Sequence, residues 1–124
     1  MKNLVSIKKS LKSFVFAFNG IRIFIYEGNN ARIHIIAAMI AILLGILLKI
    51  SLTEWMMVIL VIGLVITLEI VNSAIESLAD YVSPGKHDLI KKVKDLSAGG
   101  VLVSAISAVI IGLIIFLPKL LVYV

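Results

Sequence analysis

The chain has 124 residues, of which 61% are hydrophobic, carries a formal charge of +5 and contains no cysteine. Soluble domains are about 45–50% apolar, so the composition excludes an ordinary soluble protein and indicates a single domain embedded in a membrane. The lack of cysteine excludes disulfides and thiolate metal sites. The basic residues flank apolar segments, which is how membrane orientation is encoded, so we expect a bilayer and no nucleic acid as the partner.

Residues 1–29 predict a basic amphipathic helix. Apolar residues recur every three or four positions and form one stripe, made of Leu4, Ile7, Leu11, Phe14, Phe18, Ile21 and Ile25. Such a helix lies on an anionic membrane surface, where each Lys or Arg contributes ~1 kcal/mol, or docks on the protein's own core. No short apolar stretch with a small-residue cleavage site begins the chain, so we expect no cleaved signal peptide.

Three apolar segments predict three membrane-spanning helices, at residues 33–50, 54–82 and 96–117. In the first, His34 and Lys49 are interpreted as ordinary polar residues near the ends. A capping box at Ser51–Glu54 restarts the chain as a helix of about 43 Å, longer than the hydrocarbon core, so its last turns should emerge into water. Residues 83–95 are expected to form a polar loop, and Pro118 to close the third span. The predicted fold is an all-α integral membrane protein with one N-terminal surface helix.

The distribution of Lys and Arg predicts the orientation. Ten of them flank the N-terminal helix and the 83–95 segment, whereas only Lys49 and Lys119 lie on the other side. This asymmetry places the N-terminus and the 83–95 segment in the cytoplasm and the C-terminus outside.

A polar face near the end of the second span is the strongest functional signal. At about 100° per residue, five polar side chains fall within roughly a third of the helix circumference: Glu69, Asn72, Ser73, Glu76 and Asp80. Carboxylates are costly in a bilayer and usually mark a functional site. The alternative is a polar seam between helices, but a seam would not need three acids.

Carboxylates and lysines at a cytoplasmic membrane surface fit phosphoryl transfer. Acids hold Mg²⁺, a Lys neutralises phosphate charge, and another carboxylate accepts the proton of the attacking hydroxyl. The glycine-rich phosphate loops of soluble nucleotide-binding folds and protein kinases are absent. Two other classes of protein are alternatives. A proton or cation carrier with Glu69 and Glu76 as relay would need acids throughout the bilayer depth, and a scaffold protein leaves Lys94 and Asp95 unexplained.

Several motifs resemble the bacterial diacylglycerol kinase/undecaprenol kinase family over essentially the whole chain. They are Ser13-Phe14, Ala17, Gly20-Ile21, N-A-R-I-H (Asn30 to His34), Glu54-Trp55, E-x-x-N-S-A-x-E (Glu69 to Glu76), Asp80, P-G-x-H (Pro84 to His87) and K-D-x-x-A-G-x-V-L (Lys94 to Leu102). The resemblance implies a homotrimer in the bacterial inner membrane with active sites shared between subunits. It also implies Mg²⁺, ATP as phosphate donor and a membrane lipid alcohol as acceptor. The P-G-x-H and N-A-R-I-H motifs look more like the undecaprenol branch than the diacylglycerol branch.

The resemblance also assigns roles to residues. Glu69 would be the catalytic base and contact the lipid substrate together with Ala98, while Glu76 and Glu27 would bind the metal. The positions expected to contact ATP are Lys9, Phe16, Glu27, Asn72, Glu76, Asp80, Gly85, Lys86, His87, Lys94 and Asp95. At two of these, Lys9 and Phe16, the best-known members carry Arg and Tyr.

One position departs from the family pattern. The family's first-span acid usually stands four residues before the basic residue of R-I-H, where this chain has Gly28. Glu27 stands five residues before Arg32, and we expect it to serve as the second metal ligand.

Overall fold

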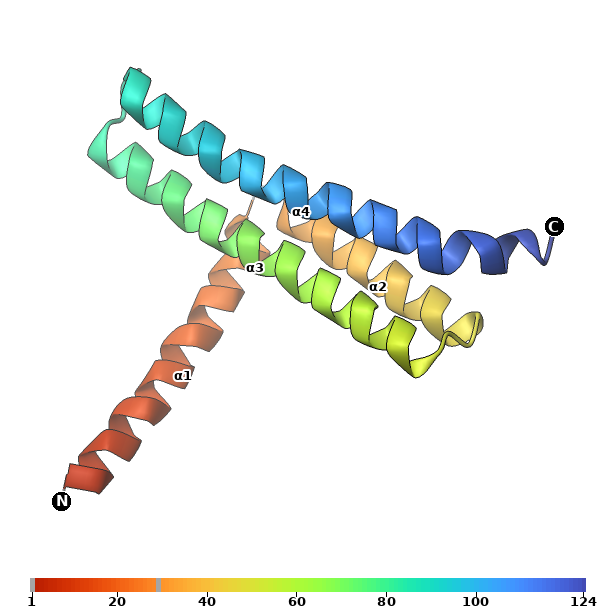
Figure 1. Ribbon diagram of the computed structural model, residues 1–124. Helices are drawn as coiled ribbons and strands as arrows, with labels where there is room; N and C mark the ends of the chain where they lie inside the picture. Colours follow the sequence, from red (N-terminus) through yellow and green to blue (C-terminus); the bar gives the residue numbers. More distant parts are fainter. Residues whose placement is uncertain (1, 29) are drawn as a thin grey trace.

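The computed structural model describes residues 2–28 and 30–124, and the side chains from Leu4 onward. Its described part consists of four helices without a strand: α1 (Lys2–Glu27), α2 (Ala31–Leu47), α3 (Leu52–Val82) and α4 (Asp88–Leu121). Helices α2, α3 and α4 run side by side, whereas α1 projects away from them (Figure 1). The axis of residues 4–27 makes an angle of 101° with that of α2. The all-α fold with a separate N-terminal helix is thus confirmed.

Several predicted helix bounds were wrong. Helix α2 ends at Leu47 rather than at residue 50, and Lys49 then takes a left-handed backbone conformation with φ of 52°. Helix α4 begins at Asp88, so most of the expected 83–95 loop is helical, and the backbone N–H of Leu89 donates to Nδ1 of His87 as the N-cap. The same helix continues through Pro118 to Leu121. At the start of α3, the predicted capping box is present: Ser51 and Glu54 exchange both hydrogen bonds.

Two of the described helices, α3 and α4, are long and apolar enough to cross a membrane. Helix α2 has 17 residues, which corresponds to about 26 Å. A third candidate arises if α1 and α2 are counted together as one bent span. Three separate spans therefore remain a prediction.

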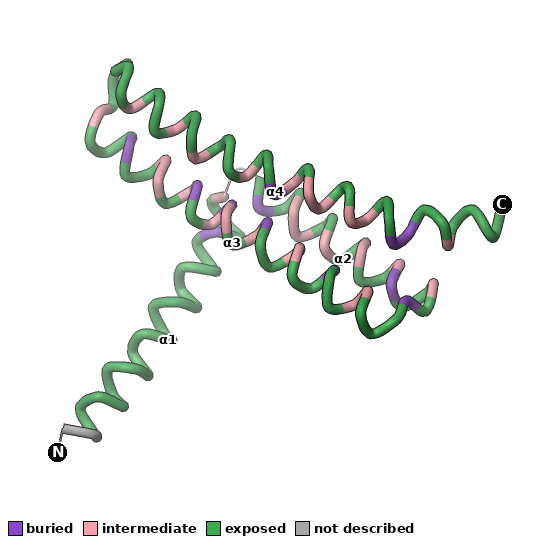
Figure 2. The backbone as a smooth tube through the Cα atoms, in the orientation of Figure 1, coloured by how far each residue is buried: buried purple, intermediate pink, exposed green. Residues whose placement is uncertain are grey.

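The chain exposes far more surface than a soluble protein of its size. Its accessible area is 9736 Å², whereas a folded soluble monomer of 13.5 kDa exposes about 6,500 Å². Most of the chain is exposed along all four helices (Figure 2), including nearly every large apolar residue of α1. Apolar surface of this extent belongs against lipid or another subunit, which fits a membrane protein.

The small core lies at the end of the bundle near the α2–α3 turn. It is formed by Ile50, Val58, Ile115 and Phe116, with Trp55 packed against them. At the same end, Lys119 Nζ lies 3.2 Å from Glu54 Oε1. The opposite end of the α3–α4 hairpin extends beyond the start of α2 (Figure 1). The polar face of α3 therefore lies away from this core, between the level at which α2 begins and the α3–α4 turn.

Candidate functional site

Two of the three buried polar side chains among the described residues lie on the polar face of α3, and the third is Ser104 on α4. Glu69 is 3% exposed and Asn72 is 8% exposed. Asn72 Nδ2 donates to Glu76 Oε1 at 3.3 Å, and the Ser73 hydroxyl donates to the backbone carbonyl of Glu69 at 3.0 Å. The predicted clustering on one helix face is therefore confirmed for Glu69, Asn72 and Glu76.

Two oxygen atoms on this face lack hydrogen-bond partners. Among the described residues, nothing donates a hydrogen bond to Glu69 Oε2 or to Asn72 Oδ1, although both atoms are buried. An unsatisfied buried polar atom costs about 1–3 kcal/mol, and more when it is charged. Native structures keep such atoms rarely, so each one calls for an explanation. Here two of them lie one helical turn apart on the polar face of α3.

His34 was interpreted as an ordinary polar residue near a helix end, and the structure corrects this interpretation. Its Nε2 lies 3.5 Å from Glu69 Oε2, within ion-pair distance but outside hydrogen-bond geometry, and its side chain is 19% exposed. The sequence offered a signal for this contact. His34 lies 13 residues before the end of α2, and Glu69 lies 17 residues after the start of α3. Because α2 and α3 form a helical hairpin, the two residues lie at heights along the hairpin that differ by only about one helical turn.

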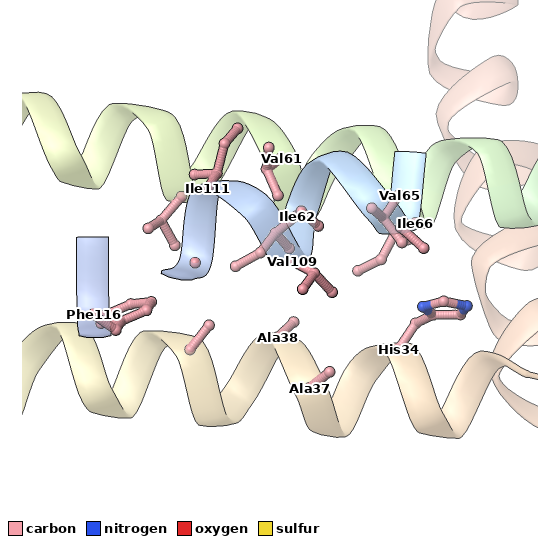
Figure 3. Close-up of a pocket in the computed structure, with 15 residues that line it drawn as sticks. His34, Ala37, Ala38, Val61, Ile62, Val65, Ile66, Val109, Ile111 and Phe116 are labelled. Carbon is pink, nitrogen blue, oxygen red and sulfur yellow. The ribbon is translucent and has the colours of Figure 1, made fainter. Parts of the chain in front are cut away.

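An apolar groove leads along the bundle to His34. Its volume is about 280 Å³, and it is lined by residues of α2, α3 and α4. Figure 3 shows His34 at one end and Phe116 at the other, with Ala37 and Ala38 on the α2 wall. Small side chains provide the space, namely Ala37, Ala38, Ala41, Ala105, Ala108 and Gly112. The imidazole ring of His34 therefore lies between the apolar groove and the buried carboxylate of Glu69.

Two ion pairs lie near the α3–α4 turn. Lys94 Nζ donates to Asp80 Oδ1, and this hydrogen bond raises the pKa of Lys94. Lys91 Nζ lies 2.7 Å from Asp95 Oδ2, and this hydrogen bond raises the pKa of Lys91. Asp80, which was expected to contact nucleotide, is therefore a partner of Lys94, and Asp95 is a partner of Lys91.

The other expected site residues are exposed, unlike Glu69 and Asn72 on the polar face of α3. Lys9 and Phe16 are exposed on α1, and Phe16 is 71% exposed. Glu27 is exposed at the end of α1. Four more are exposed near the α3–α4 turn or on α4: Gly85, Lys86, His87 and Ala98. Among the described residues, no hydrogen bond or ion pair joins any of these side chains to Glu69.

The expected metal site is suitable in chemistry but incomplete in one chain. Mg²⁺ prefers oxygen ligands. Glu76 supplies a carboxylate, and Asn72 beside it supplies the buried Oδ1 atom that lacks a hydrogen-bond partner. The described residues contain no group of three or more acidic or histidine side chains able to hold a metal.

Position 28, where the family resemblance would place an acid, is a glycine in a crowded place. A Cβ atom at this position would lie 2.5 Å from the backbone oxygen of Phe24 and 3.0 Å from Cβ of Ala31. Such distances are not tolerated without a shift of the backbone. Position 28 therefore has no room for a side chain, and Glu27 precedes it directly in the sequence.

The structure is that of an all-α membrane protein in which one carboxylate, Glu69, is buried near the end of an apolar groove. Comparison with known proteins identifies its class. Residues 15–116 match the model of the prokaryotic diacylglycerol kinase family. The chain belongs to this family, and it is a lipid kinase.

Relatives from both branches of the family are similar to the chain. It is 41% identical to an undecaprenol kinase of Bacillus subtilis over 114 residues, which are 92% of this chain and 93% of the relative. It is 38% identical to a diacylglycerol kinase of Synechocystis over 112 residues, 90% of this chain but 64% of that longer protein. It is 26% identical to the diacylglycerol kinase of Escherichia coli K12 over 108 residues, 87% of this chain and 88% of the relative.

Proposed function

We propose that the protein is an undecaprenol kinase that transfers the γ-phosphate of ATP to the lipid hydroxyl in an Mg²⁺-dependent reaction, giving undecaprenyl phosphate and ADP. The observation that carries this proposal is the buried Glu69 carboxylate, which lies beside His34 at the end of an apolar groove. A base at this place can meet the hydroxyl of a molecule whose chain stays in apolar surroundings.

In this reaction, Glu69 accepts the proton of the lipid hydroxyl while the hydroxyl oxygen attacks the γ-phosphorus. The new oxygen–phosphorus bond forms as the bond to the β,γ-bridging oxygen breaks, and ADP leaves with the electron pair. Glu76 and Glu27 would hold Mg²⁺, which neutralises charge on the phosphates. Asn72 fixes the Glu76 carboxylate through its amide, and Lys94 supplies a positive charge for the phosphate chain.

Undecaprenol is favoured as acceptor by two observations. The relative of Bacillus subtilis, which matches over nearly its whole length, is an undecaprenol kinase. In addition, the groove is a single apolar path of about 280 Å³ with five alanines and one glycine in its lining, which suits the first isoprene units of one tail. Diacylglycerol, the acceptor named for the other relatives, is the alternative.

The proposed assembly is a homotrimer of three-span subunits in the bacterial cytoplasmic membrane. Its support is the wide exposed apolar surface and the projection of α1, which carries Lys9 and Phe16, away from the bundle. The cytoplasm would contain the N-terminus and the α3–α4 turn, because ten of the twelve basic residues flank these segments.

The test is phosphate transfer from radiolabelled ATP in mixed micelles that contain either undecaprenol or diacylglycerol. We expect faster transfer to undecaprenol, and a loss of at least about 100-fold in the Glu69→Gln variant, as is usual when a general base is removed. The matched control is Glu54→Gln, the same substitution at the opposite end of α3, which should retain activity.

Each part of the proposal has its own contradicting result. Equal rates with the two lipids would reject the preference for undecaprenol and leave the kinase assignment intact. Turnover at the normal rate in Glu69→Gln would reject Glu69 as the base. Ion flux into liposomes without ATP, together with no phosphate transfer, would favour a carrier instead.

A further inference from the structure

We propose that His34 is a positioning residue that holds Glu69 Oε2 and thereby directs the other carboxylate oxygen, Oε1, toward the lipid hydroxyl. This inference rests on the proposed function, because it assigns Glu69 the role of base. The carrying observation is the 3.5 Å approach of His34 Nε2 to an oxygen that is buried and lacks a hydrogen bond among the described residues.

The burial of Oε2 decides which oxygen can react. Oε2 is shielded from solvent and faces the imidazole, so a substrate hydroxyl cannot reach it without displacing His34. A carboxylate is planar, and fixing one oxygen by a hydrogen bond fixes the direction of the other. A contact of 3.5 Å becomes a hydrogen bond after a small side-chain rotation, and catalytic hydrogen bonds are often this long before substrate binds.

The position of His34 at the groove end supports the same role. Among the described residues that line the groove, His34 has the one polar side chain, and it lies at one end of the groove (Figure 3). An alcohol whose chain lies in the groove would therefore bring its hydroxyl next to this histidine and the carboxylate that the histidine holds. His34 lies in the first turn of α2, at the end of the helix that is nearest to α1.

The experiment compares three substitutions that differ in where they place an N–H donor. His34→Gln places its amide nitrogen near the position of Nε2, His34→Asn places it near that of Nδ1, and His34→Ala has no donor. We expect His34→Ala and His34→Asn to lower kcat by about 10- to 100-fold, the usual cost of a misplaced catalytic group. His34→Gln should recover most of this loss. The KM for ATP should stay within about twofold in all three.

Different results would overturn the inference. Normal kcat in His34→Ala would show that Glu69 needs no partner, and equal losses in the Gln and Asn variants would show that the Nε2 position is not what matters. A histidine that only stabilises the bundle would lower the unfolding temperature of all three variants without separating Gln from Asn in kcat. Thermal unfolding in detergent is therefore measured alongside.

A second readout keeps this inference separate from the proposed function. The chain contains two histidines, His34 and His87, and His87 is exposed at the start of α4. In ¹⁵N-histidine spectra of the full chain, Glu69→Gln should shift the Nε2 signal of His34 and leave that of His87 unchanged. An unshifted His34 signal would reject the contact. If the wild-type protein transfers no phosphate to any lipid, the proposed function fails, while this spectrum still tests the contact.

Discussion

At the scale of single residues, the ion pair between Lys94 and Asp80 stabilises the charged form of Lys94. Its ammonium group donates to Asp80, and this hydrogen bond raises the pKa of Lys94 above its ordinary value of 10.5. The lysine therefore stays charged across the physiological range. The stability contributed by the pair is fully present below pH 10.5 and is lost only as the pH rises through the raised pKa.

Replacing Lys94 should impair the use of ATP more than replacing its partner does. We expect Lys94→Ala to raise the KM for ATP by about 10-fold or more, because hydrogen bonds between charged groups contribute about 1.5–3 kcal/mol. Asp80→Asn should change this KM by only a few-fold, because an exposed ion pair orders the lysine weakly. Steady-state kinetics with varied ATP measures both values.

The control for these substitutions is Lys92→Ala, which removes an exposed lysine from the same part of α4. Its KM for ATP should equal that of the wild type. If Lys92→Ala and Lys94→Ala raise the KM equally, the effect belongs to the net charge of α4 and not to Lys94.

At the scale of elements, the close contact between α2 and α3 depends on Gly45. A Cβ atom there would lie 2.7 Å from Cη2 of Trp55 and 3.1 Å from Cδ1 of Ile50, two residues of the small core region. The indole ring lies directly over the glycine and has few ways to move. The helical hairpin therefore tolerates no side chain at this position without repacking.

Gly45→Ala should destabilise the protein by about 1–3 kcal/mol, the usual cost of overpacking, even though Ala favours helix by about 1 kcal/mol over Gly. The matched control is Gly63→Ala on α3, where an added Cβ would meet nothing within 4 Å. The control should be neutral or slightly stabilising. Thermal unfolding in detergent measures both, and an unfolding temperature of Gly45→Ala at or above that of the wild type would contradict the packing described here.

The groove between α2, α3 and α4 gives a second test at this scale. Ala38→Leu should fill part of the groove and raise the KM for the lipid several-fold, while the KM for ATP stays the same. Gly63→Leu adds a larger apolar side chain to α3 outside the groove and serves as the control. An unchanged KM for the lipid in Ala38→Leu would show that the chain of the acceptor lies elsewhere.

The helices could be predicted from the sequence because local signals determine them. The capping box at Ser51 and the helical period of the face from Glu69 to Glu76 depend on residues three to seven positions apart. The start of α4 at Asp88 was missed because a polar composition was taken as a loop, although His87 caps the helix there. The contact of His34 with Glu69 was missed for a different reason: it depends on the register of two helices and not on either one alone.

At the scale of the whole molecule, the parts of the proposed site are distributed over distant segments. Lys9 and Phe16 precede Glu27 by 18 and 11 residues along α1, which corresponds to about 27 and 16 Å. Helix α1 projects away from the bundle (Figure 1). We therefore propose that a site that uses both segments combines α1 of one subunit with α3 of another.

Mixed trimers test this arrangement. A double variant with Lys9→Ala and Phe16→Ala, combined with Glu69→Gln subunits, should recover activity above that of either variant alone, because some interfaces then contain two intact segments. As a control, Glu69→Gln and Glu76→Gln subunits should not complement each other, since both substitutions lie on α3. No recovery in the first mixture would place the complete site within one chain.

The angle of 101° between residues 4–27 and α2 has a consequence for how the acceptor arrives. If α2 stands along the membrane normal, α1 lies in the plane of the headgroups, and the groove beside α2 faces the acyl chains of the same leaflet. The alcohol then never leaves the bilayer and reaches Glu69 by two-dimensional diffusion. The reaction rate would follow the mole fraction of the alcohol among the surrounding lipids, and adding inert lipid at constant total alcohol would slow the enzyme.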